Sequence, residues 1–226
     1  MKRYICILLT MAMLFVFPLT GCGGNDTEAM KAPVDGFLSA MQEGDFEKMK
    51  TFADGSLFEE GGSLSEFSTL QNIDEELAKS VGISVDDLSD ETKEVVDSYV
   101  KDMLNNMIKS YEITGASKDG DTAGKVTAKI TFGFNPETAS KVDVNAEMEE
   151  MVNTYMTENM AELTEIYQSG GQTALMVKVL DDMAGDILKF YTDKIMETGE
   201  TTEDVVFNVE NKDGNWVIVS EESDAI

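Results

Sequence analysis

Apolar residues recur at helical spacing through the first half of the chain. The first apolar stripe consists of Met30, Val34, Phe37, Leu38 and Met41. Residues at this spacing share one face of an α-helix, and Gly44 and Asp45 are suited to end this helix and to cap a second one. Further stripes within residues 67–81 and 96–108 predict a third helix and a longer fourth helix, which opens at Ser89.

The apolar period changes from 3.6 to 2 farther along the chain. Apolar and polar residues alternate over 125–134 and again over 205–209, as they do in half-buried antiparallel strands. An Asp-Gly turn connects each stretch to a partner, 111–113 in the first case and 216–219 in the second. Because Asp-Gly supplies the positive φ angles of a tight turn, the sequence predicts two β-hairpins.

A helical pattern returns between the two hairpins. It extends over about 145–197 and is interrupted at Ser169-Gly170-Gly171, which predicts an antiparallel pair of helices. No repeat of fixed period and no second linker divides the chain. We therefore expect residues 29–226 to form a single α+β domain, with helices on one face of an antiparallel sheet and the helical pair inserted between the strand pairs.

Two motifs give the chain a family resemblance. They are Gly44-Asp45-Phe46-Glu47-Lys48, at the start of the predicted second helix, and Asp213 to Ile218 in the closing hairpin. Both resemble the NTF2-like, cystatin-fold domains of unknown function found in small surface lipoproteins of Gram-positive bacteria. The resemblance implies a curved antiparallel sheet packed on N-terminal helices, with a pocket between sheet and helices and, in some members, catalysis there. It provides no catalytic residue that matches a position in this chain.

The pocket implied by this resemblance would lie between the first helix and the last strand. The candidates for lining it are Phe37, Leu38, Met41 and Trp216. The alternative interpretation is that all four pack in the core.

The first residues are typical of a bacterial export signal. Lys2 and Arg3 precede the apolar run Tyr4–Phe17, which is shorter than the roughly 20 residues that a membrane-spanning helix needs. We therefore expect residues 1–21 to be removed from the mature chain.

A lipid attachment site follows this apolar run. Leu19-Thr20-Gly21-Cys22 resembles the bacterial lipobox, whose cysteine receives a diacylglyceryl group before the signal is cleaved ahead of it. Two acyl chains hold a protein stably on a membrane, whereas one does so only marginally. The resemblance implies lipidation of Cys22, a short tether over residues 22–28 and a position on the extracytoplasmic face of the cell membrane. The alternative is ordinary secretory cleavage beside an incidental cysteine.

The charged composition excludes several classes of function. Removing Lys2 and Arg3 from the 17 basic residues leaves 15 lysines against 44 acidic residues, a formal charge of −29. The mature chain then has no arginine, no histidine and no cysteine other than Cys22. This excludes catalytic pairs built on histidine, histidine-bound metals and bidentate phosphate recognition by arginine. Binding to nucleic acid requires clustered basic residues, so we expect no nucleic-acid partner. Because the residue types named above are missing, we also expect no cofactor and no enzymatic activity.

Two groups of residues fit either a metal site or a structural role. Methionine pairs, such as Met148 with Met151 or Met156 with Met160, fit either a soft-metal site or ordinary core packing. Two acidic clusters fit either calcium binding or a solvated surface, and neither follows the EF-hand loop pattern. These clusters are Asp181, Asp182 and Asp186, and Asp119 with Asp121. Structural roles are the prediction for both groups, so no metal site is assigned.

Three classes of function fit the chain. The first is a non-catalytic extracytoplasmic domain that binds a small ligand or an envelope protein, with the membrane as a further partner through the N-terminal lipid. The second is an enzyme that uses Asp or Glu with a tyrosine hydroxyl, for which Tyr99, Tyr111 and Tyr191 are candidates against a purely structural role. The third is a structural protein whose helical pair docks during envelope assembly. The first is the prediction, because it requires no residue type that the chain lacks.

Overall fold

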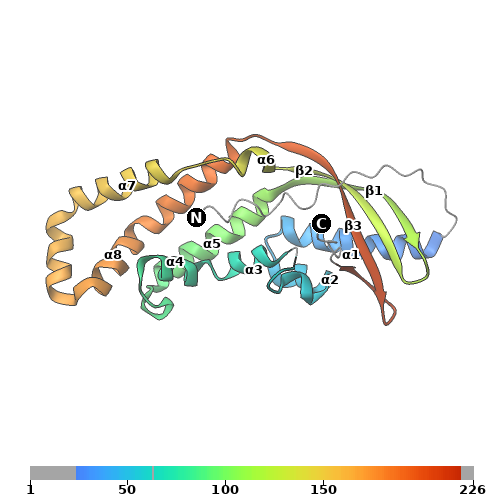
Figure 1. Ribbon diagram of the computed structural model, residues 1–226, viewed down its shortest axis with the longest axis horizontal. Helices are drawn as coiled ribbons and strands as arrows, with labels where there is room; N and C mark the ends of the chain where they lie inside the picture. The colour runs from blue at the N-terminus through green and yellow to red at the C-terminus, as the bar shows by residue number, and fades with distance from the viewer. Residues whose placement is uncertain (1–23, 63, 220–226) are drawn as a thin grey trace.

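The computed structural model describes residues 24–62 and 64–219, which Figure 1 shows as a coloured ribbon. The predicted signal peptide and Cys22 lie outside the described residues, so the lipidation of Cys22 stays a prediction. Within the described residues, no helix combines the length and the apolar character needed to cross a bilayer.

The elements follow the order expected for an α+β chain. The first half contains α1 (Gly24–Gln42), α2 (Phe46–Phe52), the 3₁₀ helix η2 (Gly55–Phe58), α3 (Ser65–Gln71), α4 (Ile73–Val81), the 3₁₀ helix η3 (Val85–Asp87) and α5 (Asp90–Met107). The second half contains β1 (Ile108–Asp119), β2 (Ala123–Phe132), α6 (Pro136–Ala139), α7 (Asn145–Glu158), α8 (Met160–Met196), β3 (Thr201–Lys212) and β4 (Asn215–Val219). This order confirms a helical insertion between two strand pairs.

Four antiparallel strands form one sheet in the order β1-β2-β3-β4. Both predicted hairpins are confirmed, since β1 pairs with β2 and β3 pairs with β4. β2 also pairs with β3, from Ala123 opposite Glu210 to Phe132 opposite Thr201. The sheet is therefore a continuous meander, although the helical insertion separates its two halves in sequence.

The inner face of the sheet packs against α1 and forms the main core. β2 and β3 place Val126, Ala128, Val205 and Phe207 on this face, and each of these residues is at most 3% exposed. The apolar stripe of α1 is buried against them, with the ring of Phe37 edge-on to that of Phe207 at 6.3 Å between centroids. The prediction that N-terminal helices cover one face of the sheet is thus confirmed.

Two helix starts are capped as the sequence predicts. Asp45 caps α2 by accepting a hydrogen bond from the backbone N–H of Lys48 at 2.9 Å, and Gly44 before it has a φ of +66°. Ser89 caps α5 by accepting from the backbone N–H of Thr92 at 3.1 Å. Each cap satisfies an N–H group that has no partner within its own helix.

Three boundaries differ from the prediction. The third predicted helix is divided at Asn72 into α3 and α4, where the side chain of Asn72 donates to the carbonyl of Ser68 at 2.8 Å and the backbone leaves helical geometry. The helical insertion is broken near Asn159 as well as at Gly171, whose φ of +74° lies in the left-handed region that favours glycine. α1 begins at Gly24, so most of the expected tether forms its first turns.

The long helices extend away from the sheet (Figure 1). α8 lies along α5, and α7 lies along α8; these three helices are called the helical arm. The C-terminal end of α8 reaches the main core through Ile195. A smaller apolar cluster of Ala78, Leu88 and Leu180 joins α8 to the segment around α4 and η3. The helical pair therefore projects from the sheet instead of covering it.

Candidate functional site

The four residues predicted to line a pocket lie in or against the main core. Phe37, Leu38 and Met41 of α1 are buried, and Trp216 of β4 is half-buried against the same cluster. This placement agrees with the alternative interpretation that the four residues pack in the core. None of the four residues lines any of the three surface cavities that the structure describes.

The candidate site is a groove between α7 and α8. This groove, called the arm groove, has a volume of about 520 Å³. It is lined by Glu147, Glu150, Met151, Thr154, Tyr155, Glu158, Asp182, Met183, Asp186 and Phe190. Met183 is buried and Met151 and Phe190 are half-buried, whereas all five carboxylate residues in the lining are exposed. The arm groove therefore combines an apolar floor with an acidic rim.

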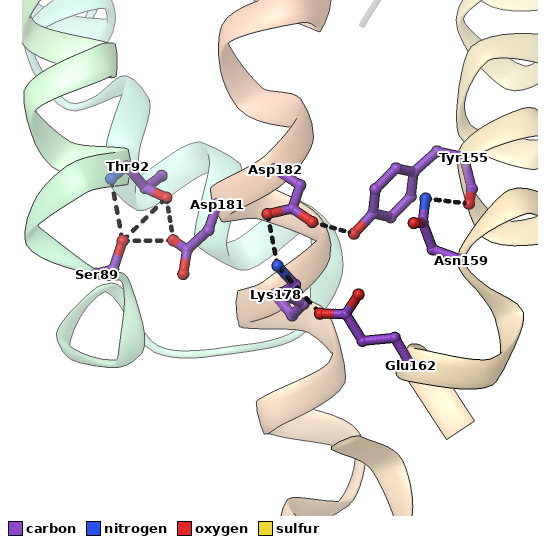
Figure 2. Close-up of polar contacts among 8 residues, drawn as sticks. All are labelled: Ser89, Thr92, Tyr155, Asn159, Glu162, Lys178, Asp181 and Asp182. Atoms are coloured by element: carbon purple, nitrogen blue, oxygen red, sulfur yellow. Dashed lines mark hydrogen bonds and ion pairs between the residues drawn. The ribbon is translucent and has the colours of Figure 1, made fainter. Parts of the chain in front are cut away.

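A polar network holds the two walls of the arm groove together, as Figure 2 shows. The hydroxyl of Tyr155 on α7 donates to Oδ2 of Asp182 on α8 at 2.5 Å. Lys178 pairs with the other oxygen of Asp182 at 2.9 Å and with Glu162 at 3.4 Å. Beside them, the side-chain amide of Asn159 donates to the carbonyl of Tyr155 at 2.9 Å and so supports the end of α7.

The protonation states of Tyr155 and Asp182 are fixed near neutral pH. Burial, together with the hydrogen bond to Asp182, raises the pKa of Tyr155 to about 12. Burial alone would raise the pKa of Asp182, but hydrogen bonds from Tyr155 and Lys178 outweigh it and lower the pKa. An effective general acid or base has a pKa near the working pH. The pair thus acts as a clamp between α7 and α8 and is poorly suited to proton transfer.

Asp181 makes a second contact, on the opposite side of α8. Its carboxylate accepts hydrogen bonds from the hydroxyls of Ser89 and Thr92, the latter at 2.5 Å. Figure 2 shows Asp181 directed toward α5 and Asp182 directed toward α7. These neighbouring residues therefore link α8 to both of the other helices in the helical arm.

The predicted alternatives for metal binding gain no structural support. Asp181 and Asp182 bind different protein partners and point apart, and Asp186 lines the arm groove. Among the described residues, no group of three or more His, Cys, Asp or Glu side chains is placed to hold a metal ion. Asp119 and Asp121 lie at the β1–β2 turn.

The three tyrosines considered for acid–base chemistry all have raised pKa values. Burial and the carboxylate of Asp35 raise the pKa of Tyr111 to about 12, and its hydroxyl donates to Oδ1 of Asp35 at 3.0 Å. Burial raises the pKa of Tyr191 to about 12, and it also raises the pKa of Tyr99 against a hydrogen bond with Thr192. These hydroxyls stay protonated at neutral pH. The sequence did not identify Asp35, because this contact joins residues 76 positions apart.

The arm groove is not predicted by the apolar pattern of the sequence, although the sequence contains one signal for it. No lysine occurs between Lys141 and Lys178, while seven acidic residues lie in that interval. A further cavity, of about 510 Å³, lies along α7 and is lined in part by Glu149 and Glu150. α7 is therefore acidic on more than one side, as the missing lysines would predict.

The geometry of the helical arm is thus an open groove between α7 and α8, joined across its walls by the contact between Tyr155 and Asp182. Comparisons with protein families, with curated proteins and with solved structures find no match for this chain.

Proposed function

We propose that this chain is a membrane-anchored, non-catalytic lipoprotein on the extracytoplasmic face of the cell membrane, and that its helical arm binds a protein partner. The lipobox-like sequence that ends at Cys22 supports the anchor. The fold proposal that accompanies it is an NTF2-like domain with a curved sheet. It is supported by α1 lying across one face of a four-stranded antiparallel meander.

The observation that carries the binding proposal is the projection of the helical arm from the sheet (Figure 1). Residues 160–170 connect α7 to the rest of α8 at the end of the helical arm farthest from the sheet. They include Met160, which is 62% exposed, and Tyr167, which is 55% exposed. Methionine and tyrosine are both enriched at protein interfaces. A partner protein also suits this surface better than a small ligand, since the arm groove is open to solvent.

A catalytic role has less support. An acid–base enzyme with this composition would need a carboxyl group with a raised pKa inside a cavity. Lysine partners instead lower the pKa of Glu43, Asp54 and Glu137, in each case chiefly through a hydrogen bond from the lysine. The pKa of Asp182, in the arm groove, is lowered as well.

The anchor is tested by the Cys22→Ala variant. We expect the wild-type protein in the membrane fraction, with an intact mass that corresponds to a diacylglyceryl chain beginning at residue 22. The variant is expected to be released or to keep its signal. A variant that behaves as the wild type does, or a wild-type chain without lipid, would refute the anchor.

The binding proposal is tested by photo-crosslinking in the cells that make the protein. A photo-reactive residue is placed at Tyr167 in the helical arm and, as a matched control, at Lys129, which is exposed on β2. We expect a discrete crosslinked envelope protein from position 167 only. Equal crosslinking from both positions, or none from position 167, contradicts the proposal.

A further inference from the structure

The arm groove has the features of a surface that receives an amphipathic helix. Its floor contains Met151 and Met183, and methionine side chains adapt to varied apolar surfaces because they are flexible and polarisable. No residue of α7 is fully buried, so the apolar side of this helix is incompletely covered by α8. We infer that the arm groove docks a lysine- or arginine-bearing amphipathic helix of the partner protein, an inference that rests on the proposed binding function.

The charge of the rim identifies the partner as basic. Glu147, Glu150 and Glu158 line the arm groove, and within the described part of the chain none of them forms an ion pair. Lys178, the nearby lysine, is already shared between Asp182 and Glu162. Among the described residues, these three carboxylates therefore have no basic partner. A cationic helix would supply the missing charges, and opposite charges speed association and select the correct partner.

The two walls of the arm groove are held in place before any partner arrives. The hydrogen bond from Tyr155 to Asp182 joins α7 to α8, and the contacts of Asp181 with Ser89 and Thr92 hold α8 against α5. A site held in its binding geometry loses less conformational entropy when it binds. The arm groove therefore does not need to form around its partner.

The open shape of the arm groove favours a helix over a small cation. Pockets for small molecules usually enclose most of the ligand surface. Here exposed carboxylates border the groove and the floor is only partly buried. A helix can place apolar side chains on Met151 and Phe190 while its basic side chains reach the rim, as in other helix-in-groove complexes.

The test measures binding of a synthetic peptide to the purified full-length protein by fluorescence anisotropy. The peptide is an amphipathic helix of leucine and lysine, about five turns long. The comparison peptide has the same composition in an order that is not amphipathic. The groove variant combines Glu147→Gln with Glu150→Gln. The control variant combines Glu59→Gln with Glu60→Gln, which removes the same charge from two exposed residues outside the described cavities.

We expect the amphipathic peptide to bind more tightly than the scrambled one, and more weakly as salt increases. The groove variant should bind it about 2- to 25-fold more weakly than the wild type, as the loss of two exposed ion pairs predicts. The control variant should bind as the wild type does. Met151→Gln should weaken binding without changing the salt dependence, with circular dichroism confirming that the variant is folded.

Two results would overturn the inference. One is equal binding of both peptides, which would indicate general attraction to an acidic protein. The other is equal binding by the groove and control variants. If crosslinking from position 167 persists in either case, the partner contacts another part of the helical arm and the proposed function stands. If the peptide binds as expected but no crosslink forms from position 167, the proposed binding of an envelope protein is refuted, whereas the arm groove still binds a basic helix.

Discussion

Removing the carboxylate of Asp181 should loosen the helical arm from α5. Asp181 accepts hydrogen bonds from Ser89 and Thr92, and Thr92 is only 1% exposed, so water cannot readily replace the lost acceptor. Hydrogen bonds to a charged group contribute about 1.5–3 kcal/mol each. One hydroxyl keeps a partner in the variant, because the Ser89 hydroxyl already lies within hydrogen-bond distance of the Thr92 hydroxyl, at 3.3 Å. The net loss is then one hydrogen bond to a charged group, so we expect Asp181→Ala to lower the free energy of unfolding by about 1.5–3 kcal/mol.

Asp181 of α8 lies beside the N-terminus of α5, and this position adds to the loss of stability expected for Asp181→Ala. Ser89 caps this helix, and a negative charge near a helix N-terminus is stabilising by about 0.3–1 kcal/mol. Asp181→Asn keeps one oxygen acceptor but loses the charge, so it should be less destabilised than Asp181→Ala. A graded loss from wild type to asparagine to alanine would separate the charge from the hydrogen bonds.

The assay is guanidinium unfolding followed by circular dichroism, with the midpoint and the slope fitted separately. A change in midpoint at constant slope reports a change in stability. The matched control is Asp186→Ala on the same helix. Asp186 forms no side-chain hydrogen bond or ion pair within the described residues, so this variant should stay within about 0.5 kcal/mol of the wild type. If Asp181→Ala and Asp186→Ala unfold at the same midpoint, the contact with α5 does not hold the helical arm.

Three further predictions follow from single contacts. Phe37→Ala should lower the free energy of unfolding by about 3–5 kcal/mol, because the ring is 1% exposed and packs on Phe207; calorimetry checks this, and a loss below 1 kcal/mol would contradict core packing. Asp45→Ala should lower the free energy of unfolding by about 1 kcal/mol, because it removes the cap of α2. Asp45→Asn should keep most of this stability, and urea unfolding compares the two variants. The pKa of Tyr155 is higher in the folded protein, about 12, than its ordinary value of 10. Tyr155 should therefore stabilise the fold fully at a pH below 10, and this contribution should be lost as the pH rises through about 12. The stability difference between the wild type and Tyr155→Phe, measured across this range, should shrink as pH rises, and a constant difference would argue against the clamp.

The elements that the sequence predicts correctly are those set by local rules. The alternation over 125–134 and an Asp-Gly turn are sufficient to predict a hairpin, and β1 and β2 confirm it. Asp45 and Ser89 are readable as caps because a capping side chain binds an N–H within three residues of itself. Such features depend on neighbours in sequence and on no distant contact.

The candidate site depends instead on contacts between distant residues. Tyr155 and Asp182 are 27 positions apart, and Asp181 meets Thr92 across 89 positions. The apolar pattern shows that α7 and α8 each have an apolar side, but it does not give the distance between the two helices. That distance decides whether their side chains close into a core or leave a groove. The family resemblance implied a pocket at Phe37 and Trp216, and the structure places Phe37 in the main core and Trp216 against it, as the alternative interpretation predicts.

The proposed anchor and the proposed binding surface belong to opposite ends of the molecule. Figure 1 shows the start of α1 at the end of the molecule opposite to the connection between α7 and α8. A lipid on Cys22 would therefore tether the sheet end, two residues before α1 begins. The part of α8 after Gly171 spans about 40 Å at 1.5 Å per residue. This length exceeds the roughly 8 Å over which salt screens charges at physiological ionic strength. The acidic rim of the arm groove would then lie beyond the electrostatic repulsion of an anionic membrane surface and would be accessible to partners in the envelope.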